Sequence, residues 1–247
     1  PPPPPPPPFS SRRRHTRYRR SSRGLGDVYK RQAQLYEFAA DLGAHVIVAN
    51  YSRYVVDLNR AADDASLYQG QLSTGLCPLN SFAGEALYKD VVLVTDEERG
   101  RRVQTYWQPY HDKIAATLAE LTDQYGYALL WDGHSIKSNV PSLFAGELPD
   151  LNFGTNDGSS CDARLLDAVV GVSQATDWSS IVNGRFKGGH ITRQYGDPQA
   201  GVQAIQLELA QKTYMDEETG EYDERRATIL QNSLERLLHA FLRSAAR

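Results

Sequence analysis

The chain has 247 residues, of which 27 are basic and 30 are acidic, so its formal net charge is −3. This length suits one domain with a sizeable core. No apolar run approaches the ~18 residues that a membrane-spanning helix needs, which argues against a membrane partner. The two cysteines, Cys77 and Cys161, do not make a disulfide framework, and we therefore expect a cytoplasmic protein.

Residues 1–32 differ in composition from the rest of the chain. Eight prolines open the segment, and nine basic residues then stand against one acidic residue. Because it lacks apolar periodicity and resembles translated sequencing-adapter DNA, we predict a disordered, non-native segment. A basic arm that binds nucleic acid is the alternative. Residues 33–247 carry 18 basic and 29 acidic side chains, a net charge of −11, which would repel nucleic acid.

Helices and strands alternate along residues 33–247, which form the predicted domain. Apolar periodicity predicts helices over 34–42, 95–124, 161–172 and 224–243, and strands over 46–49, 127–131, 181–186 and 202–209. Thr95 begins a capping box with Glu98, and Pro109 should kink the second helix. The alternation indicates a single α/β domain with a central, mostly parallel or mixed sheet flanked by helices. The long connection over 63–84 has the length of a functional or disordered loop, and whether it is a lid is open.

The most informative stretch is residues 131–135 (Trp-Asp-Gly-His-Ser), where a short buried strand is predicted to end at Trp131. Side chains in this place lie in the crevice beyond the carboxyl end of a strand, where α/β proteins bind ligands. Imidazole is the commonest protein ligand for zinc, and a carboxylate often orients it. His134 is therefore a candidate zinc ligand, and Asp132 is the candidate carboxylate that orients it. A structural role is the alternative, because most histidines at strand ends are structural. His111 lies beside an aromatic stripe, and we expect it to be structural.

A second cluster, Arg53, Asp57, Asn59 and Arg60, follows the strand predicted over 46–49. Guanidinium groups bind carboxylates in a bidentate way, and an asparagine adds directional donors. The cluster therefore suits a substrate with one or two carboxylates, and a solvated surface is the equal alternative.

A third cluster contains Arg185, His190 and Arg193 among several glycines. It is typical of a loop whose backbone approaches a small anion, and a basic surface hairpin is the alternative. Glu208 forms a fourth candidate, because it interrupts an apolar strand on the face opposite Ile205 and Leu207. On a central strand its pKa would rise, which would suit a general base.

Six blocks of the sequence, in order, resemble the N-formylglutamate amidohydrolase (deformylase) family: residues 52–60, 75–78, 106–111, 131–135, 151–155 and 188–193. The resemblance runs from about residue 33 to the C-terminus. It implies a zinc hydrolase with a fold like those of zinc carboxypeptidases and aspartoacylase. The implied reaction is cleavage of N-formyl-L-glutamate to formate and L-glutamate, in histidine degradation.

The resemblance also implies roles for particular residues. His134 would bind zinc, and Glu208 would be the general base for the zinc-bound water. Asn59 and Arg60 would hold a substrate carboxylate, with further substrate contacts from Arg53, Arg185, His190 and Arg193. The family carries two more zinc ligands before the equivalent of Gln34, where this chain has its Pro/Arg-rich run. We therefore expect the chain as written to bind zinc poorly and to have little activity.

Two alternatives remain open at this point. The substrate could be another N-acyl amino acid of the N-acylaspartate type, because specificity depends on the distance between carboxylate and carbonyl anchors. The chain could also be a non-catalytic domain that binds a small dicarboxylate, since only one convincing zinc ligand is present. The oligomeric state is left open as well.

Overall fold

The computed structural model describes residues 27–65, 75–81, 84–88 and 94–245. Most of the predicted disordered segment, residues 1–26, lies outside the described residues. Residues 27–32 belong to helix α1 (Asp27–Leu35), so the prediction of disorder is wrong for them. This helix ends at Leu35, whose side chain is fully buried in the main core.

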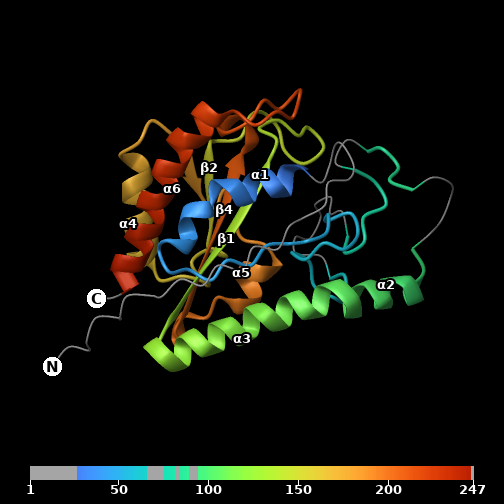
Figure 1. The fold of residues 1–247 in the computed structure, drawn as a ribbon, viewed down its shortest axis with the longest axis horizontal. Coiled ribbons are helices and arrows are strands. Elements are labelled where there is room, and N and C mark those ends of the chain that lie inside the picture. Colours follow the sequence, from blue (N-terminus) through green and yellow to red (C-terminus); the bar gives the residue numbers. More distant parts are fainter. Residues whose placement is uncertain (1–26, 66–74, 82–83, 89–93, 246–247) are drawn as a thin grey trace.

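Within the described residues a four-stranded mixed sheet forms the centre of the molecule, in the order β1-β4-β2-β3 (Figure 1). Its strands are β1 (Ala128–Ile136), β2 (Leu151–Gly154), β3 (Ser180–Val182) and β4 (Val202–Ala210). β1 pairs in parallel with β4, and β2 pairs in parallel with β3, whereas β2 and β4 are antiparallel. The predicted single α/β domain with a mixed sheet is confirmed, and β4 occupies an inner position.

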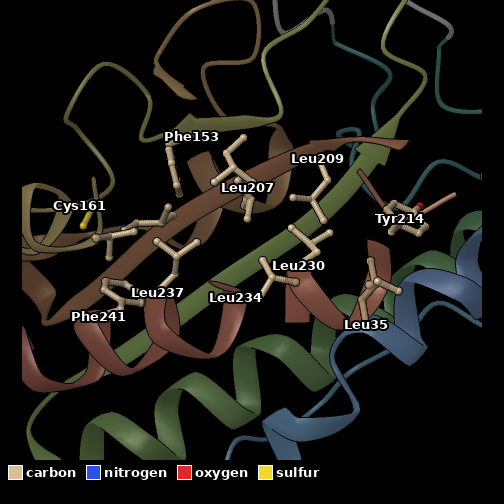
Figure 2. Close-up of a cluster of buried hydrophobic side chains, with 14 of the residues drawn as sticks. Leu35, Phe153, Cys161, Leu207, Leu209, Tyr214, Leu230, Leu234, Leu237 and Phe241 are labelled. Atoms are coloured by element: carbon tan, nitrogen blue, oxygen red, sulfur yellow. The ribbon is translucent and has the colours of Figure 1, made fainter. Parts of the chain in front are cut away.

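Helices cover both faces of this sheet. Helices α4 (Ala163–Gln174) and α6 (Glu224–Ala245) lie side by side on one face, as Figure 1 shows. In Figure 2, Leu207 and Leu209 of β4 point towards the apolar side chains of α6. Helices α3 (Gln108–Tyr125) and α5 (His190–Tyr195) contact the sheet on the other side. Since side chains alternate along β4, Gln206 and Glu208 point away from the α6 core.

The long helix predicted over 95–124 is divided into α2 (Asp96–Arg102), a π-helical turn (Val103–Trp107) and α3. Thr95 Oγ1 accepts a hydrogen bond from Glu98 N at 3.2 Å, which confirms the Thr95 half of the predicted capping box. The Glu98 carboxylate pairs with Arg101 and Arg102 instead. Pro109 stands in the first turn of α3, directly after the π-helical turn, so the predicted irregularity is also confirmed. Gly126 ends α3 with a φ of 79°.

Three of the predicted elements are wrong or shorter than expected. Residues 46–49 form no strand in the described sheet, and Val46 and Val48 are about half exposed. The helix predicted over 34–42 ends at Leu35 and is followed by the 3₁₀ turn Glu37–Ala40. The strand predicted over 181–186 is the short β3, and neither β2 nor α5 is predicted. None of the described helices combines the length and the apolarity needed to cross a membrane.

Candidate functional site

The stretch that contains Asp132 and His134 continues β1 rather than ending it. The predicted strand end at Trp131 is wrong, because β1 runs on to Ile136. The parallel ladder pairs Asp132 with Gln206 and His134 with Glu208. Paired residues of a parallel ladder point to the same side, so four polar side chains gather on the face that α5 covers. The polar residues remain in the strand because β4 offers them a continuous backbone partner.

His134 and Asp132 form a close pair on this face. The His134 Nε2 atom lies 2.6 Å from Asp132 Oδ1. The other carboxylate oxygen of Asp132 accepts a hydrogen bond from Thr192 Oγ1 of α5 at 2.9 Å. Burial alone would lower the pKa of His134, but the negative charge and hydrogen bond of Asp132 raise it to about 9. Asp132 therefore orients the imidazole and favours its charged form.

Glu208 has the environment expected of a general base. Its side chain lies on the inner strand and is 8 % exposed. Burial raises the pKa of Glu208 to about 7, against the opposing effects of His134 and Arg53. Gln206 Nε2 donates to Glu208 Oε2 over a long 3.4 Å. The carboxylate thus gains and loses a proton near neutral pH, as predicted for a glutamate on a central strand.

Asn59 is joined to both sides of this site. Its Nδ2 atom lies 3.1 Å from His134 Nε2, and its Oδ1 accepts a hydrogen bond from Ile191 N at 2.8 Å. Gly189 makes the close approach possible, because a Cβ there would lie 2.2 Å from Asn59 Nδ2. The Asn59 amide is therefore held between β1 and the first turn of α5.

The second cluster is not a solvated surface, because its cations surround a buried carboxylate. Asp57 is 4 % exposed, and its Oδ2 lies 2.5 Å from Arg53 Nη2 and 4.0 Å from Arg60 Nε. Asp57 Oδ1 accepts a hydrogen bond from the backbone of Asn59 at 3.0 Å. The two cations are thus held around one anion, and their combined charge suits a substrate carboxylate.

His111 and Trp107 hold the loop that carries Asn59 and Arg60. His111 Nε2 lies 2.9 Å from Leu58 O, and Trp107 Nε1 donates to Arg60 O at 2.8 Å. Burial lowers the pKa of His111 to about 4, so the ring is neutral at physiological pH. These contacts give His111 the structural role expected of it.

The third cluster is divided between two places. His190 begins α5, and its ring lies 5.9 Å from that of Trp107 and 5.5 Å from that of His111. Arg193 Nε donates to Gly188 O. Arg185 Nε donates to Leu143 O, next to a separate apolar cluster that includes Phe186. The expected loop is therefore partly helical, and the substrate roles of these three side chains stay predictions.

Thr192 and Gln206 are not among the site residues predicted from the sequence. Thr192 lies in a helix of six residues that periodicity does not reveal. Gln206 precedes Glu208 by one alternation, and that spacing was its only signal. Both cysteines are free, as expected, and burial raises the pKa of Cys161 to about 12.

The chain matches the family described as N-formylglutamate amidohydrolase over residues 11–215. It belongs to the N-formylglutamate amidohydrolase family. The N-formylglutamate deformylase of Pseudomonas putida is 51% identical over 223 residues, which cover 90% of this chain and 83% of that protein. The deformylase of Pseudomonas aeruginosa is 52% identical over 198 residues, covering 80% and 74% of the two chains.

Solved structures agree with this family assignment. The N-formylglutamate amidohydrolase of Ralstonia eutropha JMP134 superimposes with a TM-score of 0.59 at 26% identity, covering 78% of this chain and 73% of that one. A gene product of Agrobacterium tumefaciens, at 17% identity and a TM-score of 0.57, shares the fold and covers 85% and 86% of the two chains. The family match begins inside the segment 1–32, and the non-native origin of that segment stays a prediction.

The described residues do not fit the catalytic zinc that the resemblance implies. A catalytic zinc usually has three protein ligands, and no group of three or more histidine, cysteine, aspartate or glutamate side chains in the described ranges could hold a metal. His134 Nε2 is already in contact with Asp132 and Asn59.

Proposed function

We propose that this chain hydrolyses N-formyl-L-glutamate to formate and L-glutamate. The observation that carries the proposal is the pairing of the buried Glu208 with His134 on the ladder, beside the Asn59 amide. A glutamate whose pKa lies near 7 can take up and release a proton at physiological pH. Family membership and the names of the Pseudomonas relatives supply the substrate.

Glu208 would move the proton in this reaction. It takes a proton from water, and the water oxygen bonds to the formyl carbon. The C–N bond of the formamide then breaks, and Glu208 returns the proton to the leaving nitrogen. The immediate products are formic acid and the free amine of L-glutamate. The acid then gives its proton to the amine, so formate and the ammonium form of L-glutamate are released and protons and atoms balance.

The cations around Asp57 would bind the substrate. L-Glutamate derivatives carry two carboxylates, and Arg53 and Arg60 are held on one buried anion. A bidentate contact with one guanidinium would orient the substrate, and Asn59 would add an amide contact beside His134. The hydrogen bond that Ile191 N donates to Asn59 Oδ1 helps to keep this amide in place.

Zinc stays part of the proposal on the strength of the resemblance alone. Because the described residues lack a set of three ligands, any further ligands would have to come from outside them. We also propose, as the resemblance implies, a role in histidine degradation in the cytoplasm, without nucleic-acid or membrane partners. The likeness to zinc carboxypeptidases and aspartoacylase is likewise a proposal.

The test is formate release from N-formyl-L-glutamate, measured with and without added zinc. The chain is compared with Glu208→Gln and with a version whose residues 1–26 are replaced by the matching segment of the Pseudomonas putida relative. We expect formate release that requires Glu208, little activity in the chain as written, and more activity after the replacement. Zinc bound tightly in equimolar amount by the unreplaced chain would contradict the expectation of poor binding.

A competition between substrates separates the alternatives. N-Formyl-L-glutamate and N-acetyl-L-aspartate are supplied together, and the two products are measured. Preference for the acetyl substrate would replace the proposed substrate with one of the N-acylaspartate type. Binding of L-glutamate without turnover, even after the replacement, would favour the non-catalytic dicarboxylate-binding domain.

A further inference from the structure

Strand β4 carries two buried glutamines that make matching contacts on opposite faces. Gln206 Oε1 accepts a hydrogen bond from the backbone of Gly189 at 2.6 Å, and Gly189 is the N-cap residue of α5. Gln203 Oε1 accepts one from the backbone of Asp162 at 2.7 Å, and Asp162 is the N-cap residue of α4. Each glutamine therefore fastens the start of one helix to the central strand.

The NH₂ group of each side-chain amide faces a carboxylate. Gln206 Nε2 donates to Glu208 Oε2 at 3.4 Å, and Gln203 Nε2 donates to Asp162 Oδ2 at 3.2 Å. Only the carbonyl oxygen of an amide can accept from a backbone N–H, so the Gly189 contact fixes the orientation of Gln206. The NH₂ group of Gln206 must then point towards Glu208, even though the distance is long.

This contact leaves one oxygen of Glu208 available. Among the described residues Glu208 Oε1 makes no hydrogen bond, whereas Oε2 faces Gln206. The α5 turn that anchors Gln206 also contacts Asn59 through Ile191 and Asp132 through Thr192. Gln206 therefore connects the carboxylate to the same turn that holds the opposite side of the site.

We propose that Gln206 is a positioning residue that acts through Glu208. Its amide holds Oε2 and leaves Oε1 to face the water that attacks the substrate. This inference rests on the proposed function, because it assumes that Glu208 is the general base. Gln203 makes the same pair of contacts away from the site, so it should matter for folding but not for the reaction.

Three variants separate the two roles of Gln206. Gln206→Met removes both hydrogen bonds at similar length. Gln206→Glu keeps an acceptor for Gly189 N but removes the donor that faces Glu208. Gln203→Met is the matched control, because Gln203 is also buried on the same strand.

The kinetic test measures kcat and KM for formate release above pH 7. The substitutions are made in whichever protein releases formate, the chain as written or the version with residues 1–26 replaced. We expect both Gln206 variants to lose about 10- to 100-fold in kcat with little change in KM, the size of effect that supporting partners have on a site. Gln203→Met should lower the melting temperature and keep kcat. Wild-type kcat in Gln206→Glu would overturn the proposal, because Gln206 would then only anchor α5. An equal loss of kcat in Gln203→Met would also overturn it.

Crystal structures of the same variants test the inference by a readout that does not depend on enzymatic activity. The Glu208 carboxylate should leave its position in Gln206→Met and Gln206→Glu, and should keep it in Gln203→Met. A carboxylate that stays in place in all three would overturn the positioning role. Absence of formate release from every version, with the carboxylate displaced as expected, would refute the proposed function and leave the structural role of Gln206 standing.

Discussion

His134 of β1 lies directly opposite Glu208 of β4 in the parallel ladder. The charges of the two side chains affect each other, since Glu208 helps to raise the pKa of His134 and His134 opposes the rise in the pKa of Glu208. A proton-accepting carboxylate and an imidazole are thus positioned by one register of one sheet. A shift of this register by one residue would turn both side chains to the other face.

The pKa of Glu208 predicts the pH dependence of the reaction. A general base works only when it is deprotonated, so kcat/KM should rise with pH through about 7. Glu208→Gln should lose about 10²- to 10⁴-fold in kcat/KM, the usual range for loss of a general base. The measurement is formate release across this pH range. A profile that is flat through neutral pH would be incompatible with Glu208 as the base.

Thr192→Val should impair the site without unfolding the chain. The hydroxyl group of Thr192 donates to Asp132 Oδ2, and its loss would leave a buried carboxylate oxygen without this donor. We expect a destabilisation of about 1–3 kcal/mol and a fall in kcat. Thr117→Val, which removes a buried hydroxyl from α3, is the control for stability alone. The same loss of kcat in both variants would show that Asp132 does not depend on Thr192.

Gly189→Ala should damage the site for a steric reason. The new Cβ would lie within 2.6 Å of three side-chain atoms of Asn59, so the Asn59 amide or the start of α5 must move. We expect a destabilisation of about 1–3 kcal/mol and a raised KM. Gly171→Ala in α4 is the matched control, because no atom lies within 4 Å of its added Cβ, and it should stabilise the helix by up to about 1 kcal/mol. An unchanged KM in Gly189→Ala would mean that Asn59 does not need its observed position.

His111 should make the stability of the chain depend on pH. Its pKa falls from 6.5 to about 4 on folding, so the unfolded chain binds the proton more tightly between these values. Stability is therefore complete above pH 6.5 and falls as the pH drops towards 4, by roughly 3 kcal/mol in total. Urea unfolding on both sides of pH 6.5 should show this slope in the wild-type chain and a smaller slope in His111→Gln. Equal slopes in the two proteins would assign the pH effect to other groups.

The sequence predicts the central features of the site better than its boundaries. The alternation around Glu208 identified its face, and the helices over 224–243 and 161–172 lie close to their observed bounds. The predicted end of β1 was wrong because Asp132, Gly133 and His134 have the composition of a turn, and the sequence does not show that β4 pairs with them. Helix α5 was missed because six residues are too few to show a periodicity.

Pairings between distant segments explain the remaining differences. Residues 46–49 have the β-branched composition of a strand, but composition does not show whether a neighbouring strand is available. Arg185 belongs by sequence to a basic cluster, yet its contact with Leu143 draws it towards another part of the molecule. The role of Gln206 depends on Gly189 and could be seen only after folding brought them together.

The hydrogen bond between Asn59 and Ile191 joins positions that are 132 residues apart in the chain. Contacts of such long sequence separation close large loops and are costly in entropy, so they form late in folding. An intermediate that has built α4, α6 and the contacts between them could therefore look native in its secondary structure while its substrate site is still open. For this chain, recovery of substrate binding after dilution from denaturant should report the last step of folding, later than the recovery of helical signal.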